Sequence, residues 1–173
     1  MLCGALWITT KSVLLYLTTM EVSVMTGTLL NLFFIMLIAL FSIHRQLRST
    51  AESSFIEDVK EVAKNTARYA LLAVGLLLVF NYGIAREINT ARQVSIEREI
   101  TSHFDSEEAW QAFIEENPAQ ARADREKLRE DSLSNFRLYS SWYFQTTLAL
   151  LGLVFFSLIA SVFTTLLWRN LFR

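Results

Sequence analysis

The charge-free stretch between Leu138 and Trp168 constrains the fold of this chain more than any other feature. A helix needs about 20 mainly apolar residues to cross a bilayer, and this stretch is longer than that. Aromatic residues stand near both of its ends, where interfacial belts are found. We therefore predict a membrane-spanning helix over residues 142–168, followed by a basic tail over residues 169–173.

Three further apolar segments predict more spans. Residues 24–43 and 69–85 are free of charge, although the second is short, and residues 2–19 contain one lysine. Of the 173 residues 53% are hydrophobic, which is typical of a membrane protein. We predict an all-α protein with four transmembrane helices, the first two forming a transmembrane hairpin within residues 1–43. Because no basic flank precedes the first apolar run, a start upstream of Met1 is an alternative.

Residues 44–68 link the second and third predicted spans and contain a helix-start signal. Ser54 and Glu57 have the spacing of a capping box. Five residues then fall on one helix face: Phe55, Ile56, Val59, Val62 and Thr66. We predict an amphipathic connector at the cytoplasmic interface. It either anchors the third span or acts as a lipid-sensing or partner-binding helix.

Residues 86–141 form the longest polar segment, with eight basic and twelve acidic side chains. We predict that a helix continues out of the third span, that Asp105 caps a short helix, and that a helix over residues 119–137 returns after the Asn-Pro pair. The predicted fold class is therefore all-α, with a helical-hairpin insert outside the membrane between transmembrane helices 3 and 4.

The short helix of this loop has an apolar face made of Trp110, Phe113 and Ile114. This face is too small to form a core alone. It either caps the two longer helices or is presented to a partner protein, so these three residues are candidate partner-binding residues.

The distribution of basic residues predicts the orientation. Residues 44–68 and the tail hold Lys and Arg at a higher density than the 86–141 loop. Because cytoplasmic loops are enriched in these residues, we expect the 86–141 loop to be extracytoplasmic and both termini to be cytoplasmic.

Lys11 lies well inside the first predicted span, where a lysine costs roughly 2.5–3.5 kcal/mol on insertion. Asn31 in the second span is a possible hydrogen-bonding neighbour across the hairpin. The two residues are candidates for a polar intramembrane site. One interpretation is the polar path of a channel or transporter. The other is a lysine that snorkels or packs, because neither an acidic relay nor broken helices accompany it.

A strip of small residues recurs at helical spacing along the last span: Ser157, Ala160, Ser161 and Thr164. Small side chains allow another helix to approach closely. We therefore predict that this strip is a helix-packing face.

The sequence lacks the patterns of catalytic and metal sites. Cys3 is the single cysteine, and His44 and His103 fall on opposite sides of the membrane in the predicted topology. No zinc-protease, phosphate-loop, nucleophile-elbow or paired-cysteine motif occurs. We therefore expect no enzyme activity, metal or cofactor. The balance of 16 basic against 17 acidic residues also argues against a nucleic-acid partner.

The order of these features resembles a group of small four-span membrane proteins common in Bacteroidetes, a domain of unknown function. The segments that carry the resemblance are SFIEDVKEVAK, which leads into the third span, and TTLALLGLVFFSLIASVFTTLLWRN, which ends in basic residues. The resemblance covers nearly the whole chain but assigns no catalytic or ligand residue. It implies a Gram-negative inner membrane and a periplasmic position for the 86–141 loop.

Together these features favour a non-enzymatic inner-membrane accessory or scaffold subunit. We expect it to contact membrane lipid and to engage other membrane proteins, or copies of itself, through the periplasmic loop and the small-residue last span. The alternative is a small oligomeric channel or transporter with a polar path near Lys11 and Asn31. A lipid-modifying enzyme is less favoured, because the carboxylates and histidines are widely separated in the sequence.

Overall fold

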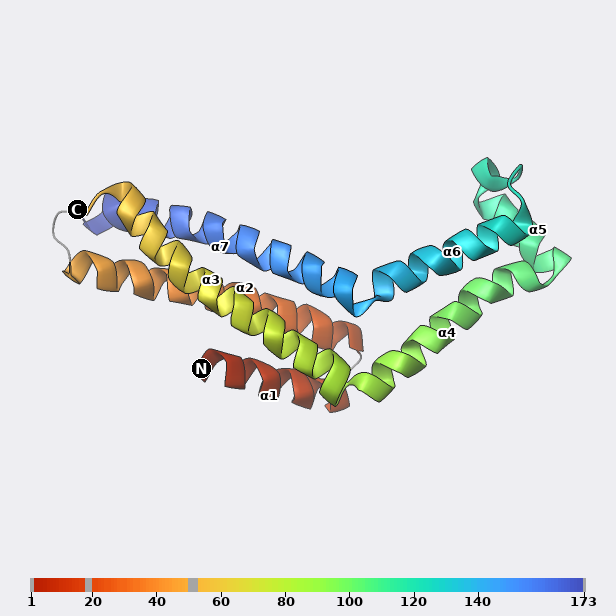
Figure 1. The fold of residues 1–173 in the computed structure, drawn as a ribbon, viewed down its shortest axis with the longest axis horizontal. Helices are drawn as coiled ribbons and strands as arrows, with labels where there is room; N and C mark the ends of the chain where they lie inside the picture. The colour runs from red at the N-terminus through yellow and green to blue at the C-terminus, as the bar shows by residue number, and fades with distance from the viewer. Residues whose placement is uncertain (1, 18–19, 50–52, 173) are drawn as a thin grey trace. The chain divides into compact units, whose positions relative to one another are not determined.

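Helices make up nearly all of the chain that the computed structural model describes, which comprises residues 2–17, 20–49 and 53–172. No strand occurs within these three ranges. The predicted all-α fold is therefore confirmed (Figure 1).

The helices belong to two compact units. Residues 1–84 and 146–173 form one, which we call the apolar unit, and residues 85–145 form the other, which we call the polar unit. The apolar unit contains α1 (Leu2–Leu17), α2 (Met20–Ser49), α3 (Phe55–Val79), the π-helix η1 (Phe80–Ile84) and most of α7 (Trp142–Phe172). The polar unit contains α4 (Arg86–Asp105), α5 (Glu107–Glu116), the 3-10 helix η2 (Pro118–Gln120) and α6 (Arg125–Ser140).

Three segments in the described ranges are long and apolar enough to cross a membrane: Val22–Arg48, Phe55–Ile84 and Trp142–Leu171. Each is longer than the roughly 20 residues that a span requires. These segments give the chain the architecture of a multi-pass membrane protein. The helix α1 has 16 residues, and the predicted span over 2–19 includes residues 18 and 19, which lie outside the described ranges. A fourth span therefore stays a prediction.

The helix α3 is continuous where a connector and a separate third span were expected. It begins at the predicted capping box, which is confirmed: Glu57 N donates to Ser54 Oγ at 3.3 Å, and Ser54 N donates to Glu57 Oε2 at 2.8 Å. No break separates residue 68 from residue 69, because no proline interrupts the helix there.

The buried face of α3 differs from the predicted apolar face at its start. Phe55 and Ile56 are exposed, whereas Asp58 is fully buried. Val62 and Thr66 are buried, one and two turns further on. The difference arises because Asp58 forms an ion pair across the unit, described below, which an apolar-periodicity argument does not detect.

The core of the apolar unit lies where α2 packs between neighbouring helices. In Figure 1, α2 lies beside α3, and α2 also contacts α1. Ile35, Ala39 and Ile43 recur at four-residue spacing along α2 and are fully buried. This spacing places them on one face of the helix, which faces the core.

The polar unit is a pair of antiparallel helices with α5 at one end. Arg137 of α6 contacts Glu97 of α4 at 2.8 Å, and Gln93 Nε2 donates to the carbonyl of Ser140 at 3.4 Å. Residue numbers that rise along α4 therefore pair with numbers that fall along α6, as expected for antiparallel helices. These contacts lie within the polar unit.

Three local details of the predicted loop are corrected. Asp105 ends α4, and the side chain that caps α5 is Ser106, whose Oγ accepts from Ala109 N at 3.1 Å. The returning helix begins at Arg125 rather than at residue 119, because Asp124 provides its cap by accepting from Lys127 N at 3.0 Å. The helix expected to run unbroken from the third span instead contains the π-helix η1 and then a turn.

Candidate functional site

Lys11 is buried in the apolar unit, with 3% of its surface exposed. Its Nζ lies 4.5 Å from the ring centroid of Phe80 and 5.1 Å from that of Trp7. Both separations fall within the range of a cation–π contact, which is worth about 2 kcal/mol when desolvated. Two such contacts offset much of the cost of placing a lysine in an apolar interior, so packing rather than snorkelling accounts for this residue.

The close approach of α1 to α2 depends on Gly27. Trp7 Nε1 donates to the carbonyl oxygen of Gly27 at 2.9 Å, which fixes the indole ring against α2. A Cβ at position 27 would lie 3.2 Å from Lys11 Cδ and 3.5 Å from Trp7 Nε1. Gly27 thus provides the space into which the lysine stem fits. Ser23 adds a second link, with its Oγ 3.4 Å from the carbonyl oxygen of Lys11.

Asn31 is also buried, at 4% exposure, but its partner is on α3. Its Oδ1 accepts a hydrogen bond from the hydroxyl of Tyr69 at 2.9 Å, and the Tyr69 ring packs edge-on against Phe34. Asn31 stands one turn beyond Gly27 on α2, so it shares a neighbourhood with Lys11. The structure gives the two candidate residues different partners, and the sequence analysis did not identify Tyr69.

A buried ion pair joins the start of α3 to the end of α7. Arg169 Nη1 donates to Asp58 Oδ2 at 2.8 Å, and Ser53 Oγ donates to Asp58 Oδ1 at 2.6 Å. Arg169 Nη2 also donates to the carbonyl of Ser53 at 3.4 Å. The carboxylate is fully buried, where an unpaired charge would be costly, and these donors balance its charge. Sequence reasoning placed Arg169 in a basic tail and assigned Asp58 no role.

The small-residue strip of α7 lies inside the apolar unit. Its four members, Ser157, Ala160, Ser161 and Thr164, are at most 2% exposed. Ser161 Oγ lies 3.2 Å from Thr66 Oγ1 of α3, which is a direct contact between the two helices. The strip therefore packs within the chain.

The face made of Trp110, Phe113 and Ile114 lies within the polar unit and is partly buried. The rings of Trp110 and Phe113 stack at 5.7 Å, and each approaches the ring of Phe104, at 5.8 and 5.5 Å. Phe104 is the last aromatic residue of α4 and is buried. We call Phe104, Trp110 and Phe113 the tip cluster. Its packing favours the interpretation that α5 caps the longer helices.

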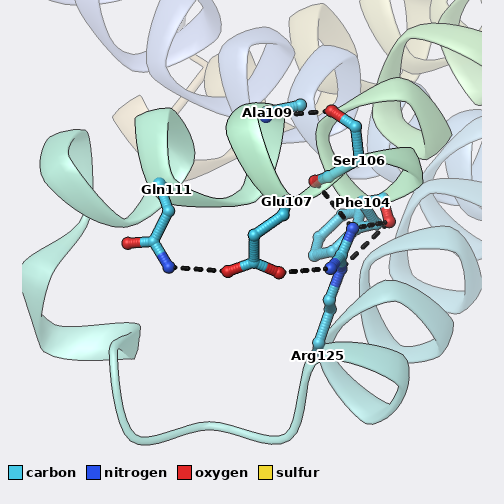
Figure 2. A network of polar contacts seen from close by, with 6 residues as sticks. All are labelled: Phe104, Ser106, Glu107, Ala109, Gln111 and Arg125. Atoms are coloured by element: carbon cyan, nitrogen blue, oxygen red, sulfur yellow. Dashed lines mark hydrogen bonds and ion pairs between the residues drawn. The ribbon is translucent and has the colours of Figure 1, made fainter.

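Arg125 of α6 points toward Phe104, Ser106 and Glu107, where α4 ends and α5 begins (Figure 2). Its guanidinium donates to the carbonyls of Phe104 and Ser106 and to Glu107 Oε2 at 3.1 Å. The guanidinium also lies 5.9 Å from the Trp110 ring. One side chain of α6 therefore binds the end of α4 and the start of α5, using donors that a lysine does not possess.

The described histidines and acidic side chains are distributed over both units. Within the described ranges, no three His, Cys, Asp or Glu side chains are placed to hold a metal ion. His44 packs edge-on against Trp168, with ring centroids 5.3 Å apart, and His103 lies 6.0 Å from the Phe113 ring. Each histidine packs against an aromatic ring of its own unit.

The fold and these contacts define a helical membrane protein with a separate polar unit. Comparisons of the chain with protein-family models, with curated proteins and with solved structures find no match. The family resemblance drawn from the sequence therefore stays a prediction.

Proposed function

We propose that this chain is a non-enzymatic accessory or scaffold subunit of a bacterial inner membrane. In this proposal α1 is the first of four spans, and the polar unit is a periplasmic insert between the third and fourth spans. Both termini are cytoplasmic. The resemblance to the four-span Bacteroidetes family supports this arrangement, as do Arg45, Arg48 and Arg169, which stand near the ends of the apolar segments of α2 and α7.

The observation that carries the proposal is that the tip cluster and Arg125 join the helices of the polar unit. The tip cluster joins α4 to α5, and Arg125 of α6 binds the end of α4 and the start of α5. A unit fixed in this way holds its outer surface in a defined shape, which is what a binding surface requires. On α5 that outer surface consists of exposed residues, among them Glu108, Gln111 and Ala112.

A photo-reactive amino acid at Ala112 tests this proposal in native membranes. We expect covalent adducts with another membrane protein, because Ala112 lies on the exposed surface of α5. The same probe at Phe104, which is buried, provides the control and should react only within the chain. A chain that purifies in mild detergent as a monomer, with no adduct from position 112, would contradict an accessory role.

The alternative of a channel or transporter receives less support from the apolar unit. Lys11 is buried against two aromatic rings and Asn31 against the Tyr69 hydroxyl, whereas a water-lined path needs polar groups that face a shared space. Ion and proton flux across liposomes that contain the purified chain distinguishes the two functions. A flux that Lys11→Met abolishes would favour the channel.

A further inference from the structure

Basic side chains follow one another along an exposed face of α3. Lys60, Lys64 and Arg68 stand at four-residue spacing, so they lie on one side of the helix. All three are exposed, and Lys64 pairs with Glu61 at 3.3 Å. We call these three residues the basic face.

Two contacts fix how α3 and α7 are aligned along their lengths. Thr66 Oγ1 lies 3.2 Å from Ser161 Oγ, and Asp58 Oδ2 lies 2.8 Å from Arg169 Nη1. Residue numbers fall along α3 from Thr66 to Asp58 as they rise along α7 from Ser161 to Arg169. The two helices are therefore antiparallel, with a defined register.

This register places the basic face level with exposed apolar side chains of α7. Lys64 precedes Thr66 by two residues, and Phe163 follows Ser161 by two, so Lys64 and Phe163 stand at the same level. Phe163 is 52% exposed. Two residues in the other direction, Arg68 is level with Ile159, which is 50% exposed. Exposed apolar side chains at these levels are suited to contact with lipid tails.

The apolar segment of α2 gives the same level for Arg68. Tyr69, its neighbour in sequence, packs against Phe34 with ring centroids 6.1 Å apart. Phe34 lies close to the middle of the apolar segment Val22–Arg48. By the register with α7, Arg68 is also level with Ile159, which lies within the apolar segment Trp142–Leu171. Its charge thus lies at a depth where lipid solvates an ion poorly.

We propose that the basic face docks a membrane-spanning helix of another protein, one that carries a carboxylate level with Arg68. The inference rests on the proposed accessory function and names its intramembrane contact. No ion pair joins Arg68 to another residue of the described ranges. A carboxylate on the partner would balance its charge through paired hydrogen bonds to the guanidinium.

A second copy of the chain fits this surface less well. Its own exposed face would bring three cations against three cations, with only Glu57 and Glu61 nearby on α3 to balance them. The partner helix would also continue an existing interface. A Cβ at Gly4 of α1 would lie 3.4 Å from Leu72 Cδ2, and Arg68 is one turn beyond Leu72.

The test places a photo-reactive amino acid at position 64 of the full chain in native membranes. Position 163 is the matched control, because Phe163 is exposed at the same level on α7. We expect adducts from position 64 that map, by mass spectrometry, to an apolar segment of another protein containing Asp or Glu. Position 163 should yield no such adduct.

Charge variants then test the proposed ion pair. Arg68→Gln should lower the yield of this adduct by about thirtyfold or more, because one partner of a buried pair is lost. Arg68→Lys should keep only part of the yield, because the charge remains but the paired hydrogen bonds are lost. Arg68→Glu should regain the yield when the partner carboxylate is changed to Arg. Because Arg68 is exposed, the melting temperature of the purified Arg68→Gln variant should match that of the parent chain, which separates lost docking from lost folding.

Adducts from position 64 that join only lipid, only this chain or its second copy, or only a segment without a carboxylate would overturn the inference. An Arg68→Gln variant with undiminished yield would do the same. If the probe at Ala112 captures a partner and the probe at position 64 captures none, the docking face is wrong and the accessory function stands. If neither probe captures a protein, both proposals fail.

Discussion

Gly27 occupies the point where the side chains of Lys11 and Trp7 meet the backbone of α2. The Trp7 indole donates to its carbonyl, and the stem of Lys11 crosses the space where a Cβ would stand. Gly27 therefore lies inside a helix, where glycine costs about 1 kcal/mol relative to alanine. The missing side chain allows α1 to pack closely on α2.

We predict that Gly27→Val destabilises the apolar unit by about 1–3 kcal/mol, because added carbons crowd Lys11 and Trp7. Thermal unfolding of the purified chain in detergent provides the measurement. Gly75→Val is the matched control, since a Cβ at position 75 meets nothing within 4 Å. Equal losses in the two variants would show that crowding at Gly27 is not the cause.

Lys11 makes a second prediction at the same scale. Lys11→Met should leave stability unchanged or raise it, because a buried charge is replaced by an apolar side chain of similar length. Phe80→Leu, with Lys11 retained, should cost about 1–2 kcal/mol through the lost cation–π contact and ring packing. A double-mutant cycle in thermal unfolding measures the coupling. If the changes in unfolding free energy of the two single variants simply add in the double variant, the ring and the ammonium do not interact.

Among the helices, α3 and α7 are joined by a charge pair rather than by apolar packing alone. We predict that Arg169→Gln costs about 3–5 kcal/mol, because the fully buried Asp58 carboxylate loses its cation. Arg169→Gln combined with Asp58→Asn should recover part of this loss, since no unpaired charge is then left. Chemical unfolding followed by tryptophan fluorescence provides the measurement. A double variant as unstable as the single one would contradict this account.

The contact between α4 and α6 should depend on pH. A hydrogen bond from Arg137 and its positive charge lower the pKa of Glu97. A carboxyl group with a lowered folded-state pKa contributes stability above its unfolded-state pKa and loses it as the pH falls through the folded-state value. We expect hydrogen exchange in α4 and α6 to increase as the pH falls from the ordinary range of glutamate titration through the lowered pKa of Glu97. The effect should be small, because the pair is solvent-exposed. Glu97→Gln should remove this acid-dependent step.

On the scale of the whole molecule, two compact units imply two sets of local stabilities. We predict that Arg125→Lys increases hydrogen exchange in α5 and leaves that of α3 unchanged, because its lost donors all serve the polar unit. Arg169→Gln should increase hydrogen exchange in α3 and leave that of α5 unchanged. In the combined variant the two effects should add to within about 0.5 kcal/mol. A change that spreads from either substitution into both units would contradict this separation.

The parts of the fold that could be predicted from the sequence depend on neighbouring residues. Ser54 and Glu57 lie three positions apart, so their capping box was visible in the sequence. Asp58 and Arg169 lie 111 positions apart, and no local pattern connects them. The hydrogen bond from Tyr69 to Asn31 likewise depends on the register of two helices, which apolar periodicity leaves open. The sequence thus predicted individual polar residues of the candidate site but not their partners.

The separation of Asp58 from Arg169 has a consequence for synthesis of the chain. The carboxylate emerges from the ribosome long before its cation, because 111 residues separate the two. At 5–20 residues per second, this interval is roughly 6–22 seconds. During that time α3 contains an acid that its final environment does not yet balance. A chain that stops before α7 has no Arg169 to balance this acid.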